Sequence, residues 1–236
     1  MTILDHFEHG FVINLPSRRD RREAIIHELE KAGMTLSSGK VSIFPAIRPE
    51  SPGAFPSIGA RGCFLSHLQV LKTALKLDLK SVLLMEDDLV ISPVVSRESE
   101  GLIRDLVKYR WDFVYLGHTV EQVEAPGIHL LPFKRDLRLT HFYAIQQAVI
   151  EPLISFLEGL LERPQGHPEG GPMHLDLAYN LFRSRTPGVR TLIASPNLGW
   201  QRKSRSDIYP NRWFDRLPGF KGAAARIGQP EEECEG

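Results

Sequence analysis

The sequence predicts an α/β fold, a single Rossmann-like domain in which helices cover a mostly parallel sheet. Short apolar runs alternate along the chain with segments whose apolar residues recur every three or four positions, which is the pattern of strands alternating with amphipathic helices. The 236 residues are 42% hydrophobic and 25% charged, a composition that suits one sizeable core. We expect this domain to span residues 1–222 and the acidic residues 223–236 to form a disordered tail.

The elements are expected in a regular order. In the first half, strands and helices should alternate as strand 11–15, helix 17–32 closed by Gly33, strand 41–47, helix 62–77 and a strand that starts at residue 81. The Pro- and Gly-rich residues 49–60 read as a loop or lid. In the second half we expect helices at 95–109, 148–162 and 174–183 and strands at 113–116, 139–145 and 189–194.

Three adjacent carboxylates, Glu86, Asp87 and Asp88, follow the strand that starts at residue 81. In a strand-helix-strand unit the helix runs antiparallel to the strands, so its N-terminus lies over the edge where the strands end. We therefore expect other polar side chains at the same edge: Asn14, Arg18, Arg19, Arg21 and Arg22 after the first strand, and Ser66 and His67 in the first turns of helix 62–77.

These residue types together predict a metal-bound diphosphate. Arginines beside helix N-termini suit phosphate, and clustered carboxylates suit a hard cation such as Mn²⁺ or Mg²⁺. We take Asp88 as the preferred metal ligand and Glu86 as the second. Each feature also has a plain structural interpretation: a solvated turn for the triplet, a charged helix start for the arginines and a packed helix residue for His67. The same holds for Asp176, an acidic residue near the start of the helix expected at 174–183, which could simply cap that helix.

The amino-acid composition limits the kinds of partner and the cellular location that we expect. Lys plus Arg and Asp plus Glu are equal at 29 each, so we expect no nucleic-acid partner. The two cysteines, Cys63 and Cys234, suggest neither a disulfide framework nor a zinc cluster, and a cytoplasmic location fits them best. We expect no signal peptide and no membrane span, because nowhere do 18 apolar residues occur together; peripheral membrane association stays open.

The motifs INLPSRRDRR (13–22), GCFLSHLQVLK (62–72) and LLMEDD (83–88) resemble those of glycosyltransferase family 25, which contains bacterial lipopolysaccharide and collagen galactosyltransferases. The match continues through 141–145, the Asp176 helix, Pro196, Gln201 and 206–208, and so covers about residues 10–208.

The resemblance implies a GT-A type fold, a UDP-sugar donor, commonly UDP-galactose, a divalent metal and inversion at the anomeric carbon. The acidic triplet stands where the family carries its Asp-x-Asp metal motif. The donor-binding residues that it implies are Asn14, Arg21, Arg22, Ser66, His67, Glu86, Asp87 and Gln201. The resemblance makes Asp176 the candidate general base, with Asp207 as the next candidate. It also implies that the acceptor is a glycan of the lipopolysaccharide type, which could be linked to a lipid.

Two other classes of function stay open. A metal-dependent phosphoesterase or nucleotidyltransferase uses the same kind of acidic strand end, but such enzymes usually gather further His and Asp ligands, and apart from His118 the sequence offers few. A noncatalytic relative that only binds a nucleotide-sugar is expected to have lost the acidic triplet, which is intact here.

Overall fold

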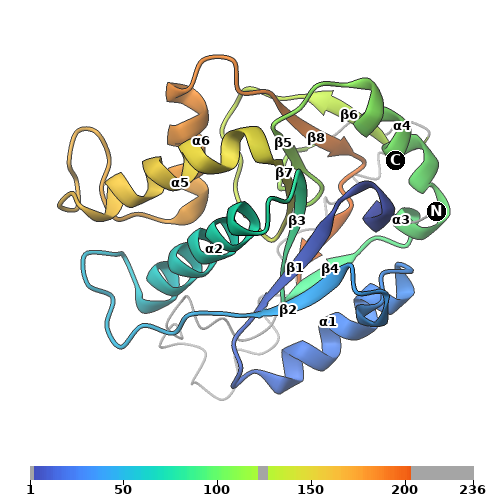
Figure 1. The fold of residues 1–236 in the computed structure, drawn as a ribbon, viewed down its shortest axis with the longest axis horizontal. Helices are drawn as coiled ribbons and strands as arrows, with labels where there is room; N and C mark the ends of the chain where they lie inside the picture. The colour runs from blue at the N-terminus through green and yellow to red at the C-terminus, as the bar shows by residue number, and fades with distance from the viewer. Residues whose placement is uncertain (1–2, 122–126, 203–236) are drawn as a thin grey trace, which may run out of the picture. The chain divides into compact units, whose positions relative to one another are not determined.

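A seven-stranded sheet forms the central layer of the computed structural model, which describes residues 3–121 and 127–202 (Figure 1). Its strand order is β2-β1-β3-β7-β5-β8-β6. The strands are β1 (His9–Asn14), β2 (Val41–Pro45), β3 (Ser81–Glu86), β5 (Phe113–Tyr115), β6 (His129–Pro132), β7 (Phe142–Gln146) and β8 (Thr191–Ser195). Five of them, β1, β2, β3, β5 and β8, run in one direction, and β6 and β7 run against them. The predicted α/β fold with a mostly parallel sheet is confirmed.

Helices cover both faces of the sheet (Figure 1). One face carries α2 (Ile58–Lys76), α5 (Gln147–Leu161) and α6 (Leu175–Arg185). The other carries the 3-10 helix η1 (Ile3–His6), α1 (Arg19–Lys31), α3 (Val94–Arg97) and α4 (Ser99–Lys108). A short 3-10 turn, η2 (Leu36–Ser38), precedes β2. Alternation along β3 supplies both cores, since Val82 and Leu84 join the α2 side while Leu83 and Met85 join the α1 side.

A second, two-stranded sheet continues directly from the acidic turn. β4 (Leu89–Ile91) pairs antiparallel with β9 (Gly199–Gln201), and the backbone N–H of Arg202 donates to the carbonyl of Asp88 at 2.6 Å. The sequence pattern did not predict either strand, because three residues are too few to show a period. This pairing places Gln201 opposite Leu89, next to the carboxylates.

The start of α2 differs from the prediction. The helix begins at Ile58 because Ser57 caps it, accepting a hydrogen bond from the N–H of Ala60 at 3.0 Å. Ser66 and His67 therefore lie about two turns inside the helix, and the expectation that they occupy its first turns is wrong. The segment called a loop or lid correspondingly ends at Ser57.

Two other predicted elements are also altered. The helix expected at 95–109 is divided into α3 and α4 at Glu98. The strand expected from residue 139 begins only at Phe142, and Leu139 has a φ of 74°, a region that a branched side chain rarely enters.

Some predictions lie outside the described residues: the domain boundary at 222, the acidic tail 223–236 and the reserve base Asp207. Among the helices that the structure describes, none has the length and apolar character needed to cross a membrane.

Candidate functional site

Glu86, the last residue of β3, is the centre of a polar cluster at the carboxyl edge of the sheet. Its Oε1 accepts from Oγ1 of Thr140 at 3.2 Å and lies 3.3 Å from Nε2 of His67. Its Oε2 accepts from Nε2 of Gln201 at 3.2 Å. Burial acts to raise the pKa of Glu86, but the contact and charge of His67, with smaller contributions from His141 and Thr140, outweigh it and lower the pKa. Glu86 is therefore held as a carboxylate.

Asp87 points to the opposite side and ties β3 to the start of α1. Its Oδ2 accepts from Nδ2 of Asn14 at 2.8 Å, and its Oδ1 accepts from Nη1 of Arg21 at 2.9 Å. Asn14 also donates to the carbonyl of Arg18 at 3.2 Å. The predicted convergence of Asn14, Arg21 and the triplet is thus present, and both oxygens of Asp87 are used within the fold.

Asp88 is the carboxylate of the triplet with the least compensation. Its Oδ2 lies 3.5 Å from Nη1 of Arg21, while its Oδ1 is buried and has no hydrogen-bond partner in the described part of the chain. Burial, then the negative charge of Glu86, raise the pKa of Asp88 to about 7, although Arg21 acts in the opposite direction. A buried carboxylate oxygen without a donor, beside a second carboxylate, fits a divalent cation.

Asp176 reaches the same edge from the first turn of α6. Its Oδ1 accepts from the backbone N–H of Leu177 at 2.9 Å, and its Oδ2 accepts weakly, at 3.5 Å, from the N–H of Leu139. Its negative charge and those of Glu86 and Asp88 all act to raise the pKa of the Cys63 thiol. Because Leu139 adjoins Thr140, which donates to Glu86, Asp176 approaches the cluster from another segment of the chain. The unusual φ belongs to Leu139 itself, whose N–H meets Asp176, and the next residue, Thr140, meets Glu86.

His67 is fixed by two buried tyrosines. Its Nδ1 forms a 3.0 Å hydrogen bond with the hydroxyl of Tyr143, which bonds that of Tyr179 at 2.8 Å. The pKa of each tyrosine is raised, chiefly by burial, so both hydroxyls keep their protons. The chain Tyr179–Tyr143–His67 leads from α6 through β7 to α2, and it sets the orientation of the imidazole beside Glu86.

The structure places two of the predicted site residues, Ser66 and Arg22, outside the polar cluster around Glu86. Ser66 is buried, and its hydroxyl donates to the carbonyl of Gly62 at 2.6 Å and accepts from the N–H of Ile47 at 2.8 Å. A Cβ at Gly62 would lie 2.8 Å from the Ile47 carbonyl oxygen, so a glycine is needed there. These contacts hold the exit of β2 against α2. Arg22 is exposed on α1.

Three site residues were not assigned a site role from the sequence. Cys63 precedes His67 by one helical turn and therefore shares its face, and its Sγ lies 4.0 Å from Oε1 of Glu86. Tyr143 lies in a motif of the family resemblance, and Thr140 directly precedes that motif. The contacts of Tyr143 with His67 and of Thr140 with Glu86 depend on the antiparallel β3–β7 pairing, which alternation alone does not predict.

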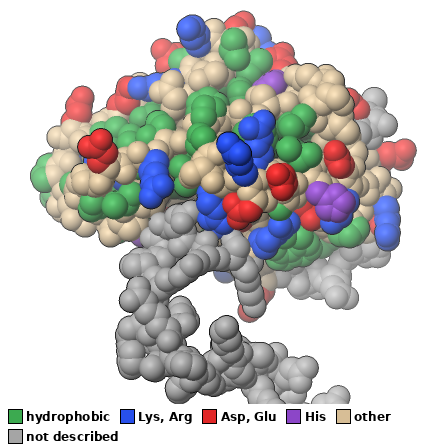
Figure 2. Space-filling view, turned by 90° about the horizontal axis from the view of Figure 1, so that it is seen from below, with side chains coloured by type: hydrophobic (Ala, Val, Ile, Leu, Met, Phe, Trp, Pro, Cys, Tyr) green, Lys and Arg blue, Asp and Glu red, His purple; other side chains and the backbone are tan. Residues whose placement is uncertain are grey.

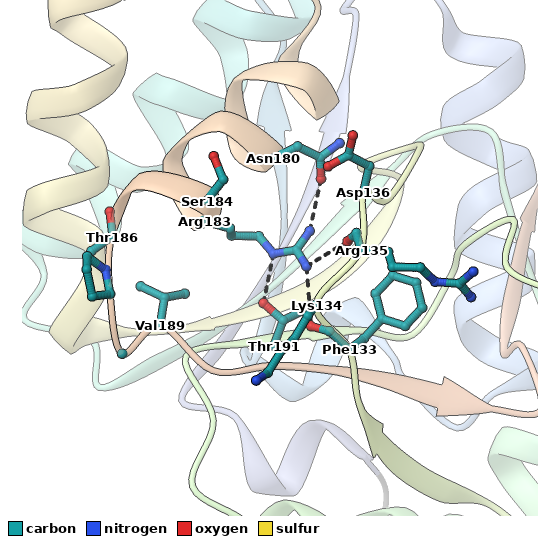
Figure 3. Close-up of a pocket in the computed structure, with 12 residues that line it drawn as sticks. Phe133, Lys134, Arg135, Asp136, Asn180, Arg183, Ser184, Thr186, Val189 and Thr191 are labelled. Atoms are coloured by element: carbon teal, nitrogen blue, oxygen red, sulfur yellow. Dashed lines mark hydrogen bonds between the residues drawn. The ribbon is translucent and has the colours of Figure 1, made fainter.

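A separate pocket lies at the other edge of the sheet (Figure 3). Its central cation, Arg183, donates to Oγ1 of Thr191 at 2.8 Å, to Oδ1 of Asn180 at 2.9 Å and to the carbonyl of Arg135 at 3.1 Å. Thr191 begins β8, whereas the carboxylates follow the end of the parallel strand β3. The guanidinium holds the loop after β6 in place, and the pocket is not part of the acidic site.

Charges of both signs are interleaved over the face shown in Figure 2. The coloured residues of this face therefore do not form the single-signed basic field that typifies a nucleic-acid-binding surface.

Residues 7–133 match the family model described as glycosyltransferase family 25 (LPS biosynthesis protein). Procollagen galactosyltransferase 1-A of Xenopus laevis is 33% identical over 138 residues, which cover 51% of this chain and 23% of that protein. Inactive glycosyltransferase 25 family member 3 of Mus musculus is 31% identical over 144 residues, covering 52% and 24%. The chain spans about a quarter of the length of these curated relatives.

Among solved structures, a glycosyltransferase involved in the glycosylation of the major capsid of PBCV-1 aligns with a TM-score of 0.47 and 11% identity, over 78% of this chain and 79% of that one.

Replacement of Asp88 by Asn is expected to stabilise the metal-free fold at alkaline pH. Because the folded-state pKa, about 7, exceeds the ordinary value of 3.8, the folded protein retains a proton that the unfolded chain has lost, and stability declines as pH rises between these values. In chelator at pH 8 the gain should be about 1 to 3 kcal/mol in urea unfolding, since one pKa unit corresponds to about 1.4 kcal/mol. Near pH 4 the gain should vanish.

The exposed Asp136 supplies the matched control. Asp136→Asn should leave the unfolding free energy unchanged at both pH values. An Asp88→Asn protein that is less stable than the unmutated one at pH 8 would show that Asp88 is a stabilising partner of Arg21.

Proposed function

The chain belongs to glycosyltransferase family 25, and we propose that it transfers a hexose, galactose first among the candidates, from a UDP-sugar to a glycan hydroxyl with inversion. The single observation that carries the proposal is the half-buried Asp88 at the carboxyl edge of the sheet, whose Oδ1 is buried without a hydrogen-bond donor among the described residues and whose pKa is raised by burial and by Glu86. Ligands of open α/β sheets bind at that edge.

A divalent metal, Mn²⁺ or Mg²⁺, fits the two carboxylates. Asp88 and Glu86 are its proposed ligands, because both are carboxylates and the Oδ1 of Asp88 is buried without a hydrogen-bond donor among the described residues. When bound there, the metal neutralises charge on the diphosphate of the donor as it leaves.

The other residues of the edge are proposed to position this pair. Arg21 and Asn14 hold Asp87, and Arg21 also offsets the charge of Asp88. Gln201 and His67 keep Glu86 in place from β9 and α2. The donor roles of Ser66 and Arg22 rest on the family resemblance alone, because the hydroxyl of Ser66 is used by the backbone and Arg22 is exposed.

Asp176 is the proposed general base. It belongs to α6 rather than to the β3 turn, as a base opposite the leaving diphosphate requires, and it is only half-buried. Its carboxylate takes the proton from the acceptor hydroxyl while the oxygen attacks the anomeric carbon. The bond between that carbon and the phosphate oxygen breaks, and UDP leaves with the electron pair.

The acceptor proposed is a surface glycan of the lipopolysaccharide type, lipid-linked or free. The words "LPS biosynthesis protein" in the family description support it, while the procollagen galactosyltransferases favour a protein-linked acceptor instead. A cytoplasmic location completes this proposal and rests on the small number of cysteines. A lipid-linked acceptor would in addition require peripheral membrane association.

A noncatalytic role is the second candidate, because one relative at 31% identity is named inactive. Such a protein would bind a UDP-sugar without turning it over. The intact triplet with its unpartnered Asp88 oxygen favours the catalytic role.

Mn²⁺ should tighten UDP binding at least about tenfold, equivalent to about 1.4 kcal/mol, because a cation held by Asp88 and Glu86 would offset the negative charge of the diphosphate. Asp88→Ala should remove this gain, and Asp136→Ala, far from the acidic edge, should retain it. Calorimetric titrations of UDP in Mn²⁺ and in chelator measure both. Equal UDP affinity in the two buffers would contradict the metal role.

Asp176→Asn should lower turnover by about 10² to 10⁴-fold, the usual contribution of a general base, while UDP affinity in Mn²⁺ stays near that of the unmutated protein. The amide keeps the size of the side chain, and its one oxygen still accepts from the N–H of Leu177, whereas its NH2 group cannot accept the weak bond from the N–H of Leu139. Single-turnover rates with saturating donor separate the two effects. Weakened donor binding with an unchanged transfer rate would make Asp176 a donor ligand instead of the base.

A further inference from the structure

Three potential metal ligands of different chemistry meet on the α2 side of Glu86. Sγ of Cys63, Nε2 of His67 and a carboxylate oxygen of Glu86 all lie within 4.8 Å of one another. Cys63 and His67 are four residues apart on α2 and share one face, and Glu86 ends the neighbouring strand β3. Asp88, the preferred ligand for a hard cation, is not a member of this group.

The spacing of the three atoms is close to what a single ion requires. Metal–ligand bonds of about 2.0 to 2.3 Å in tetrahedral geometry separate ligand atoms by roughly 3.3 to 3.8 Å. Nε2 of His67 lies 3.3 Å from Oε1 of Glu86, and Sγ of Cys63 lies 4.0 Å from the same oxygen. Small side-chain adjustments would place all three around one centre.

His67 gives an independent indication of a ligand. The side chain is 1% exposed, yet its Nε2 has no hydrogen-bond partner among the described residues, and the approach to Glu86 lacks hydrogen-bond geometry despite its 3.3 Å distance. Its other nitrogen, Nδ1, is held by the Tyr143 hydroxyl at 3.0 Å. A histidine that is fixed through one nitrogen and directs the other toward a thiol and a carboxylate has the arrangement of a metal ligand.

The groups around Glu86 and the net charge of the three ligands also suit a divalent metal ion. Thr140 and Gln201 donate to the two oxygens of Glu86 and so orient the carboxylate. Cys63 and Glu86 lie against each other, and a cation offsets the negative charge that a thiolate and a carboxylate bring together there. Coordination displaces to solvent the thiol proton of Cys63 and, from a charged His67, the proton on Nε2. A divalent ion with one thiolate, one carboxylate and a neutral imidazole then forms a site of zero net charge.

We propose that Cys63, His67 and Glu86 bind a thiophilic divalent ion, Zn²⁺ above all, at a site that shares only Glu86 with the one proposed for Mn²⁺ or Mg²⁺. Thiolate and imidazole select Zn²⁺ over these harder ions. Three protein ligands leave one tetrahedral position for water. Because Glu86 belongs to both ligand sets, Zn²⁺ competes with the donor-binding metal for this carboxylate.

Cobalt substitution tests the site without any sugar donor, so the outcome is independent of the proposed transfer reaction. The full chain is stripped with chelator and titrated with Co²⁺ alone. We expect thiolate-to-cobalt charge-transfer absorption that saturates at one equivalent and disappears when one equivalent of Zn²⁺ is added. A large excess of Mg²⁺ should leave it in place.

The two cysteines of the chain provide a matched pair of variants. Cys63→Ser should abolish the charge-transfer band, and Cys234→Ala should retain it. His67→Gln should weaken Co²⁺ binding by at least about tenfold, as loss of one ligand or its support does. Circular dichroism identifies any variant that fails to fold, and Cys63→Ala then replaces Cys63→Ser. The proposal is overturned if the unmutated protein shows no such band, or if the band follows Cys234 instead of Cys63.

Discussion

The crowding of three consecutive, largely covered carboxylates at the end of one strand is the constraint on which the rest of the structure depends. Ionised carboxylates are costly to bury unless cations or hydrogen-bond donors compensate them. Arg21 and Asn14 from the β1–α1 junction, His67 from α2, Thr140 from the approach to β7 and Gln201 from β9 all supply this compensation. Strands and helices from distant parts of the chain are therefore fixed around one acidic turn.

The three carboxylates are compensated to different degrees, and this difference distinguishes the structural carboxylate from the two with a proposed functional role. Asp87 has both oxygens bound and joins β3 to α1. Glu86 is oriented from two sides, while Asp88 keeps one buried oxygen without a donor in the described residues and has a raised pKa. A fold that keeps a carboxylate oxygen buried without a donor is less stable until a cation binds there. Such a loss of stability is common at functional sites.

The sequence predicted the large features well because long periodic segments carry them. The helices α1 and α5, the strand β3 and the shared edge of Asn14, Arg21 and the triplet all follow from apolar spacing and from the direction of strand-helix-strand units. The early start of α2 was missed because Ser57 lies in a Pro- and Gly-rich segment that resembles a loop. The contacts of Cys63 and Thr140 with Glu86 depend on packing between elements, and no local pattern encodes them.

The most direct test of the account is slow donor hydrolysis, in which water replaces the acceptor. The protein is incubated with a panel of UDP-sugars in Mn²⁺ or in chelator, and the release of UDP and free sugar is followed by chromatography. The account predicts Mn²⁺-dependent release from one UDP-hexose, with UDP-galactose as the leading candidate, and loss of this release in Asp88→Ala. Release that is equal in chelator, or unchanged in Asp88→Ala, would contradict the assignment of the acidic edge as a metal-assisted sugar-transfer site.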